Sequence, residues 1–308
     1  MENLIIGVDH GYAAMKTHHC VFSTGLVEYE HKPYTGKDVL EYDGKYYVVG
    51  SNRQKLQKDK MKTDEYYLLT LAAIAKELLY RQAERAVNIR LAAGLPLANF
   101  GRDLEAFRQY LLRGSQPVAF RYDGYDFLIT ITGVSLFPQG YAAALFQQEL
   151  MRAASVFLVD IGGWTLDMMR LDGKVPDAET CRSLEQGVIR CLDEIMEHSR
   201  RYLGLSITIA QIESVLRGET EGIVESVVRL VHQRAEVYVR ELFRTFDQQG
   251  IDVYAIPTIF MGGGAALLKR FMPPAIRPFH SVILDDVTLN AKAYERLTEQ
   301  LQQRKQKT

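Results

Sequence analysis

Hydrophobic and polar residues follow two kinds of pattern along this chain, and together they predict an α/β fold. Short apolar runs that end at a turn residue are typical of buried strands. Such runs lie at residues 4–9, 87–94, 155–161, 166–171, 256–261 and 281–284, and a further strand is expected at 174–180, after the Asp172-Gly173 turn. Longer segments with apolar residues three and four positions apart predict helices. These segments lie at residues 64–85, 102–112, 139–151, 221–249 and 286–302.

Turn residues divide the first part of the chain into small antiparallel units. Asp43-Gly44 and Asp123-Gly124 supply the positive φ angles of two-residue hairpin turns. The expected meander and hairpins cover residues 13–22, 25–29, 39–49 and 118–134. The polar stretch at 51–62 is expected to form an exposed loop, with Thr63 as the N-cap of the helix that follows.

The strands at 4–9 and 155–161 end in the same short pattern. Asp9-His10-Gly11 follows the first apolar run and Asp160-Ile161-Gly162 follows the second, so each run ends at an Asp with a glycine two residues later. The repetition predicts two similar lobes whose Asp-Gly turns face one cleft. The expected lobes cover residues 1–150, to which a C-terminal helix at 286–308 returns, and 151–285.

Turns of this kind can bind phosphate. A turn directly after a strand presents successive backbone N–H groups, and glycine lets the backbone approach an anion closely. A carboxylate at the end of the strand can hold hydrated Mg²⁺. Gly262-Gly263-Gly264 follows the strand at 256–261 and opens a short helix, so it is a third candidate contact. If each residue is considered without the other motifs, Asp9 and Asp160 could simply end their strands, and Lys16 could be a solvated strand residue.

Composition narrows the class of protein. Hydrophobic residues make up 47% of the 308 residues, which excludes a disordered chain, and the length suits two domains of ordinary size or one large domain. The formal net charge of −1 argues against a surface that coats nucleic acid. No apolar window approaches the roughly 18 residues of a membrane span. Three cysteines without paired spacing and the lack of a signal-peptide pattern favour a reducing, cytoplasmic location.

Five motifs, in order along nearly the whole chain, resemble those of the actin–Hsp70–sugar-kinase superfamily of ATPases. They are the first phosphate motif (Asp9–Lys16), the first connecting motif (Phe137–Ala143), the second phosphate motif (Asp160–Asp167), the adenosine motif (Met261–Ala265) and the second connecting motif (Leu289–Ala291). The second phosphate motif is the strongest match. Within the superfamily, the chain length and the Phe137-Pro138-Gln139-Gly140 stretch are most similar to ParM-type bacterial actins, which form filaments that segregate plasmids.

The resemblance implies an actin-like two-lobed fold, in which each lobe is a duplicated RNase H-like mixed sheet flanked by helices and the nucleotide lies in the cleft between them. The implied ligands are ATP, with GTP as an alternative, and Mg²⁺. Gln139, which would orient the attacking water, and Asp160 would be catalytic. Asp9 and Asp160 would hold Mg²⁺ through water, and Lys16 would neutralise phosphate charge. The other implied nucleotide contacts are Gly11, Tyr12, Gly162, Gly163, Thr165, Asp167, Glu185 (toward the ribose or base), Gly262, Gly263, Gly264 and Asn290.

Two places depart from the family's pattern. The first phosphate loop usually contains a small hydroxyl residue, but here His10, Tyr12, Ala13 and Ala14 occupy it. The backbone amides of the loop remain, and His10 is expected to be structural rather than catalytic. Ala293 stands where the second connecting motif usually has glycine.

The most specific prediction is an ATP-hydrolysing, filament-forming protein that drives plasmid DNA segregation. The expected partners are copies of the same chain and a DNA-binding adaptor bound to a centromere-like site, with no direct contact to DNA or to a membrane. Two alternatives stay open. A small-molecule kinase for a sugar or acetate would need a carboxylate base, whereas the connecting motif offers Gln139. A cell-division or cell-shape adaptor would use the nucleotide as a structural ligand.

Overall fold

The computed structural model describes residues 4–51 and 60–307. The chain divides into two compact units. Unit 1 comprises Met1–Phe146 and Val287–Thr308, and unit 2 comprises Gln147–Asp286. Each unit has its own hydrophobic core.

The strands of unit 1 form one mixed sheet in the order β3-β2-β1-β7-β9-β8-β5-β6-β4. The strands are β1 (Leu4–His10), β2 (Ala14–Lys16), β3 (Val21–Ser23), β4 (Leu26–Tyr29), β5 (Val39–Tyr42), β6 (Lys45–Val49), β7 (Ala86–Leu95), β8 (Pro117–Tyr122) and β9 (Tyr125–Pro138). β7 is parallel to both β1 and β9, whereas β2, β3 and β8 pair in antiparallel fashion.

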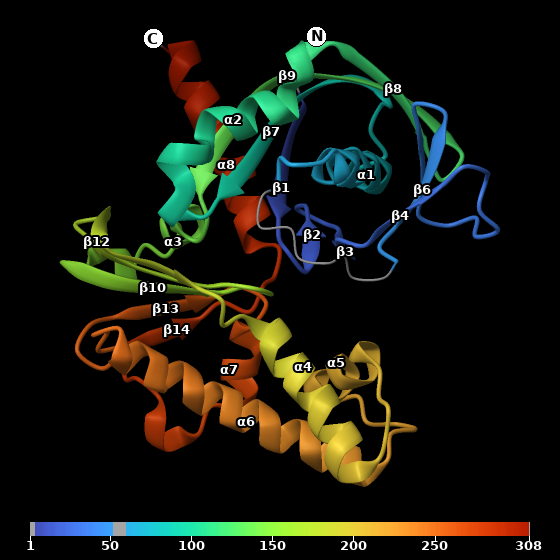
Figure 1. Ribbon diagram of the computed structural model, residues 1–308. Helices are drawn as coiled ribbons and strands as arrows, with labels where there is room; N and C mark the ends of the chain where they lie inside the picture. The colour runs from blue at the N-terminus through green and yellow to red at the C-terminus, as the bar shows by residue number, and fades with distance from the viewer. Residues whose placement is uncertain (1–3, 52–59, 308) are drawn as a thin grey trace. The chain divides into compact units, whose positions relative to one another are not determined.

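This sheet curls around helix α1 (Glu65–Tyr80), as Figure 1 shows. The segment from Tyr66 to Ala75 is buried throughout, which agrees with its nearly continuous run of apolar side chains. Helix α2 (Phe100–Leu112) is more amphipathic and buries Phe107 and Leu111 in the same core. The curled sheet therefore encloses α1 and fixes the direction in which β1 ends.

The C-terminal helix α8 (Leu289–Lys307) lies against β1 and β7 at two glycines. A Cβ at Gly7 would overlap the carbonyl oxygen of Ala291, and a Cβ at Gly94 would overlap the ring of Tyr294. Ala293 replaces the glycine that the family usually has in this helix, and it is buried. The close approach between helix and sheet thus depends on glycines in the strands.

Unit 2 contains a second mixed sheet in the order β12-β11-β10-β13-β14. Its strands are β10 (Ser155–Ile161), β11 (Leu166–Asp172), β12 (Val175–Leu184), β13 (Thr258–Met261) and β14 (Ser281–Ile283). β10 and β11 pair in antiparallel fashion, whereas β10, β13 and β14 are parallel. The order and directions repeat those of β3-β2-β1-β7-β9, so the predicted α/β fold with two similar mixed sheets is confirmed.

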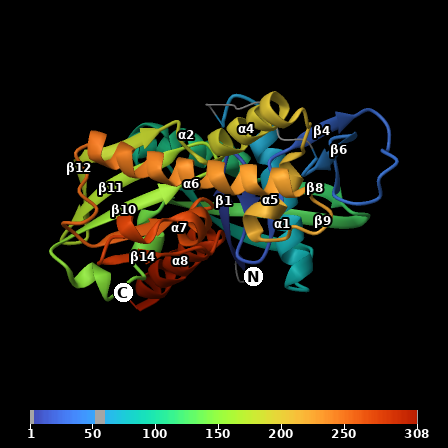
Figure 2. The same cartoon turned by 90° about the horizontal axis from the view of Figure 1, so that it is seen from below.

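Helices α6 and α7 lie on one face of this second sheet, and Figures 1 and 2 show both along it. The helices of unit 2 are α4 (Val188–His198), α5 (Ile209–Arg217), α6 (Glu225–Gln248) and α7 (Ala265–Phe271), with a π-helical turn at Ser199–Leu203. Alternate side chains of β10 lie in the core that these helices cover, namely those of Phe157, Val159 and Ile161. None of the helices in the described ranges is long and apolar enough to cross a membrane.

The predicted helix over 139–151 is wrong. β9 continues to Pro138, only Tyr141–Ala144 form an α-helical turn (α3), and Leu150–Arg152 form a 3₁₀ turn. Gly140 adopts a positive φ of 73°, so the chain leaves the strand through a turn. A few alanines cannot offset the cost of nucleating a longer helix without a packed partner.

The bounds of the first helix also differ from the prediction. The N-cap position belongs to Asp64, whose side chain makes no capping hydrogen bond and pairs instead with Arg113, so the predicted Thr63 cap is wrong. The helix ends at Tyr80 because Gln82 adopts a positive φ of 52° and the Ala83 amide donates back to Leu78. Residues 52–59 of the predicted exposed loop lie outside the described residues.

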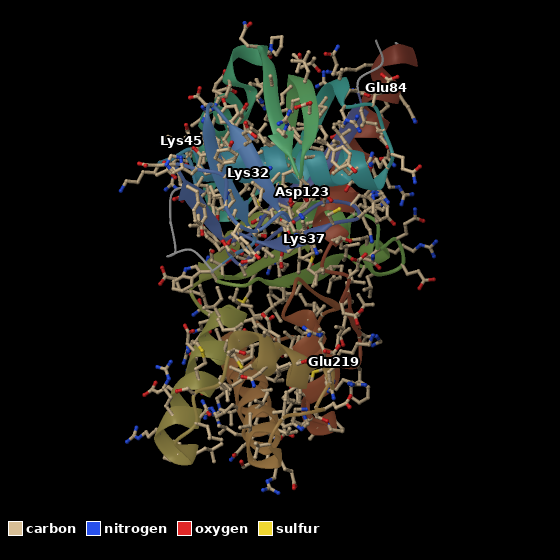
Figure 3. The ribbon with its side chains drawn as sticks, turned by 90° about the vertical axis from the view of Figure 1, so that its right-hand side faces the viewer. Lys32, Lys37, Lys45, Glu84, Asp123 and Glu219 are labelled. Carbon is tan, nitrogen blue, oxygen red and sulfur yellow. The ribbon has the colours of Figure 1, made fainter. Side chains whose placement is uncertain are left out.

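Charged side chains in the hairpins of unit 1 support the sheet from its surface (Figure 3). Asp123, in the β8–β9 turn, accepts a hydrogen bond of 2.9 Å from the Val39 amide of β5. Lys45 of β6 lies 2.7 Å from Glu28 of the neighbouring β4. Such exposed pairs contribute little stability, so the buried core remains the main determinant of the sheet.

Candidate functional site

The predicted site residues fall in both units, and each set is described within its own unit. Unit 1 contains Asp9, Gly11, Tyr12, Lys16, Gln139 and Asn290. Unit 2 contains Asp160, Gly162, Gly163, Thr165, Asp167, Glu185, Gly262, Gly263 and Gly264.

Asp9 is the centre of the unit 1 set. It lies near the end of β1, is 3% exposed, and is directly opposite Lys16 in the β1–β2 ladder. Lys16 Nζ lies 2.9 Å from Asp9 Oδ2, and Gln139 Nε2 donates to Asp9 Oδ1 at 3.0 Å. Burial alone would raise the pKa of Asp9, but the charge and hydrogen bond of Lys16 hold that pKa below its usual value. The carboxylate is therefore ionised and fixed by two partners.

The carbonyl groups of the four residues after Asp9 each contact a hydrogen-bond donor from another part of unit 1. Lys60 Nζ donates to the His10 carbonyl, and the Tyr66 hydroxyl lies 3.4 Å from that of Gly11. Thr24 Oγ1 donates to the Tyr12 carbonyl at 2.8 Å, and the Thr24 amide donates to that of Ala13 at 3.3 Å. In a planar trans peptide the N–H group points opposite to the C=O group. The amide that follows each carbonyl therefore points away from the partner of that carbonyl, and such amides can donate to an anion.

His10 belongs to the interior and not to the chemistry of the loop. It is fully buried, its Nε2 lies 2.9 Å from Thr70 Oγ1, and its ring meets that of Phe107 edge-on at 5.3 Å. Burial and the charge of Lys60 lower the pKa of His10 to about 3, so the imidazole is neutral. This environment agrees with the prediction that His10 is structural rather than catalytic.

Gln139 and Asn290 are joined through one turn. The Gln139 amide donates to the Leu95 carbonyl at the end of β7, at 2.8 Å. The next amide, that of Gly140, donates at 3.1 Å to Oδ1 of the buried Asn290 at the start of α8. Asn290 thus holds the turn that carries Gln139. Because Gln139 Nε2 is engaged with Asp9, its Oε1 is the atom available to accept from a water.

The second Asp-x-Gly turn, in unit 2, is closed by its own backbone. The Gly162 amide donates to the Thr165 carbonyl at 2.8 Å, and Thr165 Oγ1 donates to Asp167 Oδ2 at 2.7 Å. The predicted contacts of Gly162 N–H and the Thr165 hydroxyl with phosphate would therefore have to replace these bonds. The amides of Gly163 and Trp164, inside the turn, are better placed as donors in this conformation.

Three glycines pack against this turn so closely that side chains are excluded. A Cβ at Gly262, whose φ is +86°, would overlap Asp160 Oδ1, and a Cβ at Gly264 would overlap the Ile161 side chain. A Cβ at Gly187 would lie 2.5 Å from the carbonyl oxygen of Gly163. A Cβ at Gly263 would have nothing within 4 Å. Unit 2 thus brings the second loop and the glycine triplet together, and glycine is required at two of the triplet's three positions.

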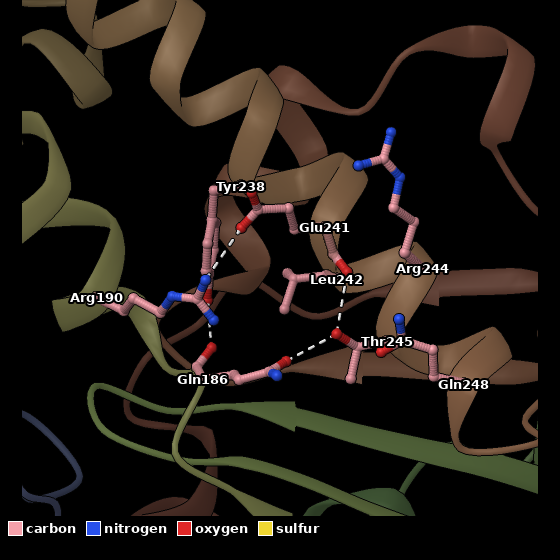
Figure 4. A pocket seen from close by; sticks show the side chains of 8 residues that line it. All are labelled: Gln186, Arg190, Tyr238, Glu241, Leu242, Arg244, Thr245 and Gln248. Atoms are coloured by element: carbon pink, nitrogen blue, oxygen red, sulfur yellow. Dashed lines mark hydrogen bonds and ion pairs between the residues drawn. The ribbon is translucent and has the colours of Figure 1, made fainter.

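Gln186, which the sequence did not indicate, anchors the turn before α4. Its Oε1 accepts from Thr245 Oγ1 at 2.8 Å, and its backbone carbonyl accepts from the Tyr238 hydroxyl at 2.9 Å (Figure 4). A cavity of about 260 Å³ opens there between α4 and α6. It is lined by Gln186, Arg190, Tyr238, Glu241, Leu242, Arg244, Thr245 and Gln248. The neighbouring Glu185 is exposed and does not line this cavity.

Lys60 is the second residue that sequence reasoning missed. The stretch 51–62 was expected to be exposed, yet Lys60 is 7% exposed and contacts the first loop, so that prediction is wrong at this residue. A lysine close to a helix start within a polar segment carries no local signal of burial. Its partners lie about fifty residues earlier in the chain.

The carboxylates fit Mg²⁺ only as part of a larger ligand set. Among residues 4–51 and 60–307, no group of three or more histidine, cysteine, aspartate or glutamate side chains could hold a metal ion. Both Asp9 oxygens already have partners in Lys16 and Gln139. This suits Mg²⁺, which keeps several waters and binds through one or two carboxylates together with phosphate oxygens.

Comparison with known proteins found an actin-like family model over part of the chain and solved actin-like structures over nearly all of it. Residues 7–141 match the family described as actin like proteins N terminal domain. No curated protein sequence matches the chain. Three solved structures share the fold over nearly all of both chains, at identities that support the fold alone.

The first is Ta0583, an archaeal actin homolog, in complex with ADP (19% identity, TM-score 0.76, 96% of this chain and 99% of that chain). The second is a 15-stranded ParM filament from Clostridium botulinum (17%, 0.78, 97% and 100%). The third is Bacillus thuringiensis ParM with ATP (14%, 0.69, 98% and 100%). Residues 7–141 thus match an actin-like family model, and the whole chain has the fold of ParM and archaeal actin homologues.

Proposed function

We propose that this protein binds ATP with Mg²⁺, hydrolyses it, and assembles into filaments when ATP is bound. The observation that carries the proposal is the first loop, in which four successive carbonyls are held by the protein beside the Asp9–Lys16 pair. The second Asp-x-Gly turn and the glycine triplet of unit 2 supply the matching elements. The ADP-bound archaeal homologue and the ATP-bound ParM support a nucleotide as the ligand.

The proposed chemistry depends on positioning and electrostatics, as phosphoryl transfer generally does. Lys16 and the amides of Gly11 and Tyr12 would bind phosphate oxygens, and Asp9 and Asp160 would each hold a water of the Mg²⁺. The bound Mg²⁺ would neutralise charge that develops on the phosphates. Gln139 would accept a hydrogen bond from the attacking water through Oε1, because Asp9 fixes the other end of its amide.

On the nucleoside side, Gly262, Gly263 and Gly264 would let the nucleoside lie against the backbone. Glu185 is proposed for the ribose or base, Thr165 and Asp167 for the edge of the second loop, and Asn290 for holding the Gln139 turn. GTP is the alternative nucleotide. Competition between ATP and GTP for one fluorescent analogue would rank them.

Light scattering, pelleting and electron microscopy with ATP, ADP and no nucleotide test the proposal. We expect filaments with ATP and phosphate release that follows assembly. Gln139→Ala should still assemble but release phosphate at least about tenfold more slowly, since a positioned group that assists proton transfer contributes about 10²-fold or more. Gln300→Ala, an exposed glutamine on α8, is the matched control and should behave as the parent.

The outcomes separate the proposal from other functions. No binding of ATP or ADP and no polymer would overturn it. Phosphorylation of a sugar or of acetate without polymer would instead identify a small-molecule kinase. Nucleotide binding with only background phosphate release, unchanged in Gln139→Ala, would favour a non-hydrolysing adaptor.

We further propose plasmid DNA segregation in the cytoplasm as the task of the filament, on the basis of the similarity to ParM. A separate DNA-binding adaptor would connect filament and DNA, because a net charge of −1 gives the chain no general attraction to DNA. Loss of a plasmid from dividing cells after deletion of the gene, restored by the intact gene, is the expected result. Unchanged plasmid inheritance would remove this part of the proposal.

A further inference from the structure

The first loop has no small hydroxyl residue of its own, and the structure shows Lys60 in contact with it. The residue is buried and precedes α1 by a few positions, whereas its neighbour Lys62 is exposed. Burial of an ammonium group is costly unless its charge is compensated. The partners of Lys60 therefore indicate what the burial achieves.

Three partners of Lys60 belong to the first loop or to the helix beneath it. Lys60 Nζ donates to the His10 carbonyl, and it lies 4.5 Å from the ring centroid of Tyr12 and 5.6 Å from that of Tyr66. Cations over aromatic faces gain attraction that increases when the group is desolvated. The Tyr66 hydroxyl in turn lies 3.4 Å from the Gly11 carbonyl. The Lys60 ammonium group thus contacts a backbone carbonyl of the loop and a side chain of the loop. It also contacts a helix side chain that itself lies against the loop.

The His10 carbonyl is the first of the four that are held toward the protein. Because C=O and N–H of one peptide point in opposite directions, fixing this carbonyl fixes the direction of the Gly11 amide. The Gly11 amide is one of the two loop amides proposed to bind phosphate. The positive charge of Lys60 also adds to that of Lys16, which pairs directly with Asp9.

We propose that Lys60 is a positioning residue for the first loop, and that its contacts with the His10 carbonyl and the Tyr12 ring set the affinity of the loop for nucleotide phosphates. This inference rests on the proposed function, since it assumes that the loop binds a nucleotide.

Calorimetric titration with Mg²⁺–ADP tests the proposal on four variants of the full chain. Lys60→Met should weaken ADP at least about tenfold, in line with the loss of a charge-assisted hydrogen bond. Lys60→Arg, which keeps the charge and the donor, should restore affinity to within about threefold. Tyr12→Leu, which removes the ring, should weaken ADP by an intermediate factor. Lys62→Met, which removes an exposed lysine two residues away, should match the parent.

Two further measurements distinguish positioning from general loss of structure. In Lys60→Met the KM for ATP should rise by about the same factor as the ADP Kd, while kcat changes less than about threefold, because the lost contact acts before the chemical step. Amide hydrogen exchange should accelerate in a peptide covering residues 8–16 and stay unchanged in one covering 155–167. If Lys60→Met does not fold, the same measurements on Tyr12→Leu decide the question.

The inference would be overturned by a folded Lys60→Met that binds ADP within twofold of the parent, or by Lys60→Arg failing as badly as Lys60→Met. Failure of the parent to bind ADP would instead overturn the proposed function. Equal acceleration of exchange in both peptides would show that Lys60 supports overall stability and not the loop.

Discussion

The two Asp-x-Gly loops are alike in sequence but are held by different means. The first loop is fixed from outside by side chains, with Lys60, Tyr66 and Thr24 holding its carbonyl groups. The second loop closes on itself through the Gly162–Thr165 bond and is enclosed by glycines at 187, 262 and 264. A loop held by side chains depends on particular functional groups. A loop enclosed by glycines depends on the absence of side chains.

The largest expected effect follows from adding one methyl group beside the second loop. In Gly262→Ala the new Cβ would overlap Asp160 Oδ1, and the residue would keep a φ of +86° that L-residues rarely adopt. We expect the free energy of unfolding to fall by about 3–5 kcal/mol, from overpacking and left-handed strain together. Denaturant unfolding of the variant measures this loss.

Gly263→Ala is the matched control for that change. A Cβ there has nothing within 4 Å, so the free energy of unfolding should stay within about 0.5 kcal/mol of the parent. Equal losses of unfolding free energy in the two variants would show that close packing against the second loop is not the reason why position 262 requires glycine. The pair therefore tests the dependence of unit 2 on glycine directly.

A smaller but still large effect is expected in unit 1, where β1 is anchored by charges. Arg81 lies 2.6 Å from the buried Glu77 and 2.9 Å from Glu295, and Glu295 also accepts from the Gly7 amide at 3.0 Å. Arg81→Met would leave two buried carboxylates without their shared cation. Since the Arg81 side chain is 20% exposed, we expect a loss of about 2–3 kcal/mol, at or below the usual cost of breaking a buried pair.

The control for this variant is the exposed Arg229, which pairs with Glu225 on α6 at 2.6 Å. Arg229→Met should change the free energy of unfolding by no more than about 0.5 kcal/mol. If Arg81→Met were as mild as Arg229→Met, the charge cluster would not be what anchors β1. The contrast between a charge-anchored strand in unit 1 and a glycine-enclosed loop in unit 2 would then be lost.

Acid should weaken the charge-held unit. Burial alone would raise the pKa values of Asp9 and Glu77, but their partners hold both pKa values below the usual 3.8 and 4.5. A carboxyl whose folded pKa is depressed stabilises the fold above its unfolded pKa, and this contribution is lost as pH falls through the folded pKa. Stability should therefore decline below about pH 4.5, with the decline continuing below pH 3.8.

Hydrogen exchange as a function of pH checks this prediction. After correction for the intrinsic exchange rate, the peptide covering residues 8–16 should lose protection on acidification. In Arg81→Met the dependence of stability on pH between pH 7 and 4 should become shallower or reverse, because Glu77 no longer has its cation. If the stability of Arg81→Met depends on pH in the same way as that of the parent, Glu77 is not responsible for the pH dependence.

The difference between the loops also explains what the sequence could reveal. Asp9, Gly11, Asp160 and Gly162 form a local pattern, because a strand, a turn and a glycine are all specified by adjacent residues. The repeat of that pattern predicted two similar lobes, and the family resemblance implied a mixed sheet in each. Local patterns are less reliable where tertiary contacts decide, as in the predicted helix over 139–151, where the structure has only one α-helical turn and one 3₁₀ turn.

Contacts between distant segments could not be predicted in this way. Lys60 reaches the loop from fifty residues away, and Asn290 reaches Gly140 from one hundred and fifty residues away. In the sequence, only the following Gly187 indicates that Gln186 lies at a turn. The second loop was the more predictable of the two because its closing bond joins Gly162 and Thr165, three positions apart in the chain.

The smallest expected effect is spectroscopic and concerns the second loop alone. Trp164 is the only tryptophan, and its carbonyl accepts from the Gly187 amide at 2.9 Å, so its backbone is part of that loop. A nucleotide that binds the amides of Gly163 and Trp164 should alter the surroundings of the indole and shift its emission. In Tyr12→Leu, which alters only the first loop, saturation should require more ADP while the final change in emission stays the same. Unaltered emission at saturating ATP would place the ligand away from the second loop, and a changed final emission in Tyr12→Leu would show that the two loops are not held independently.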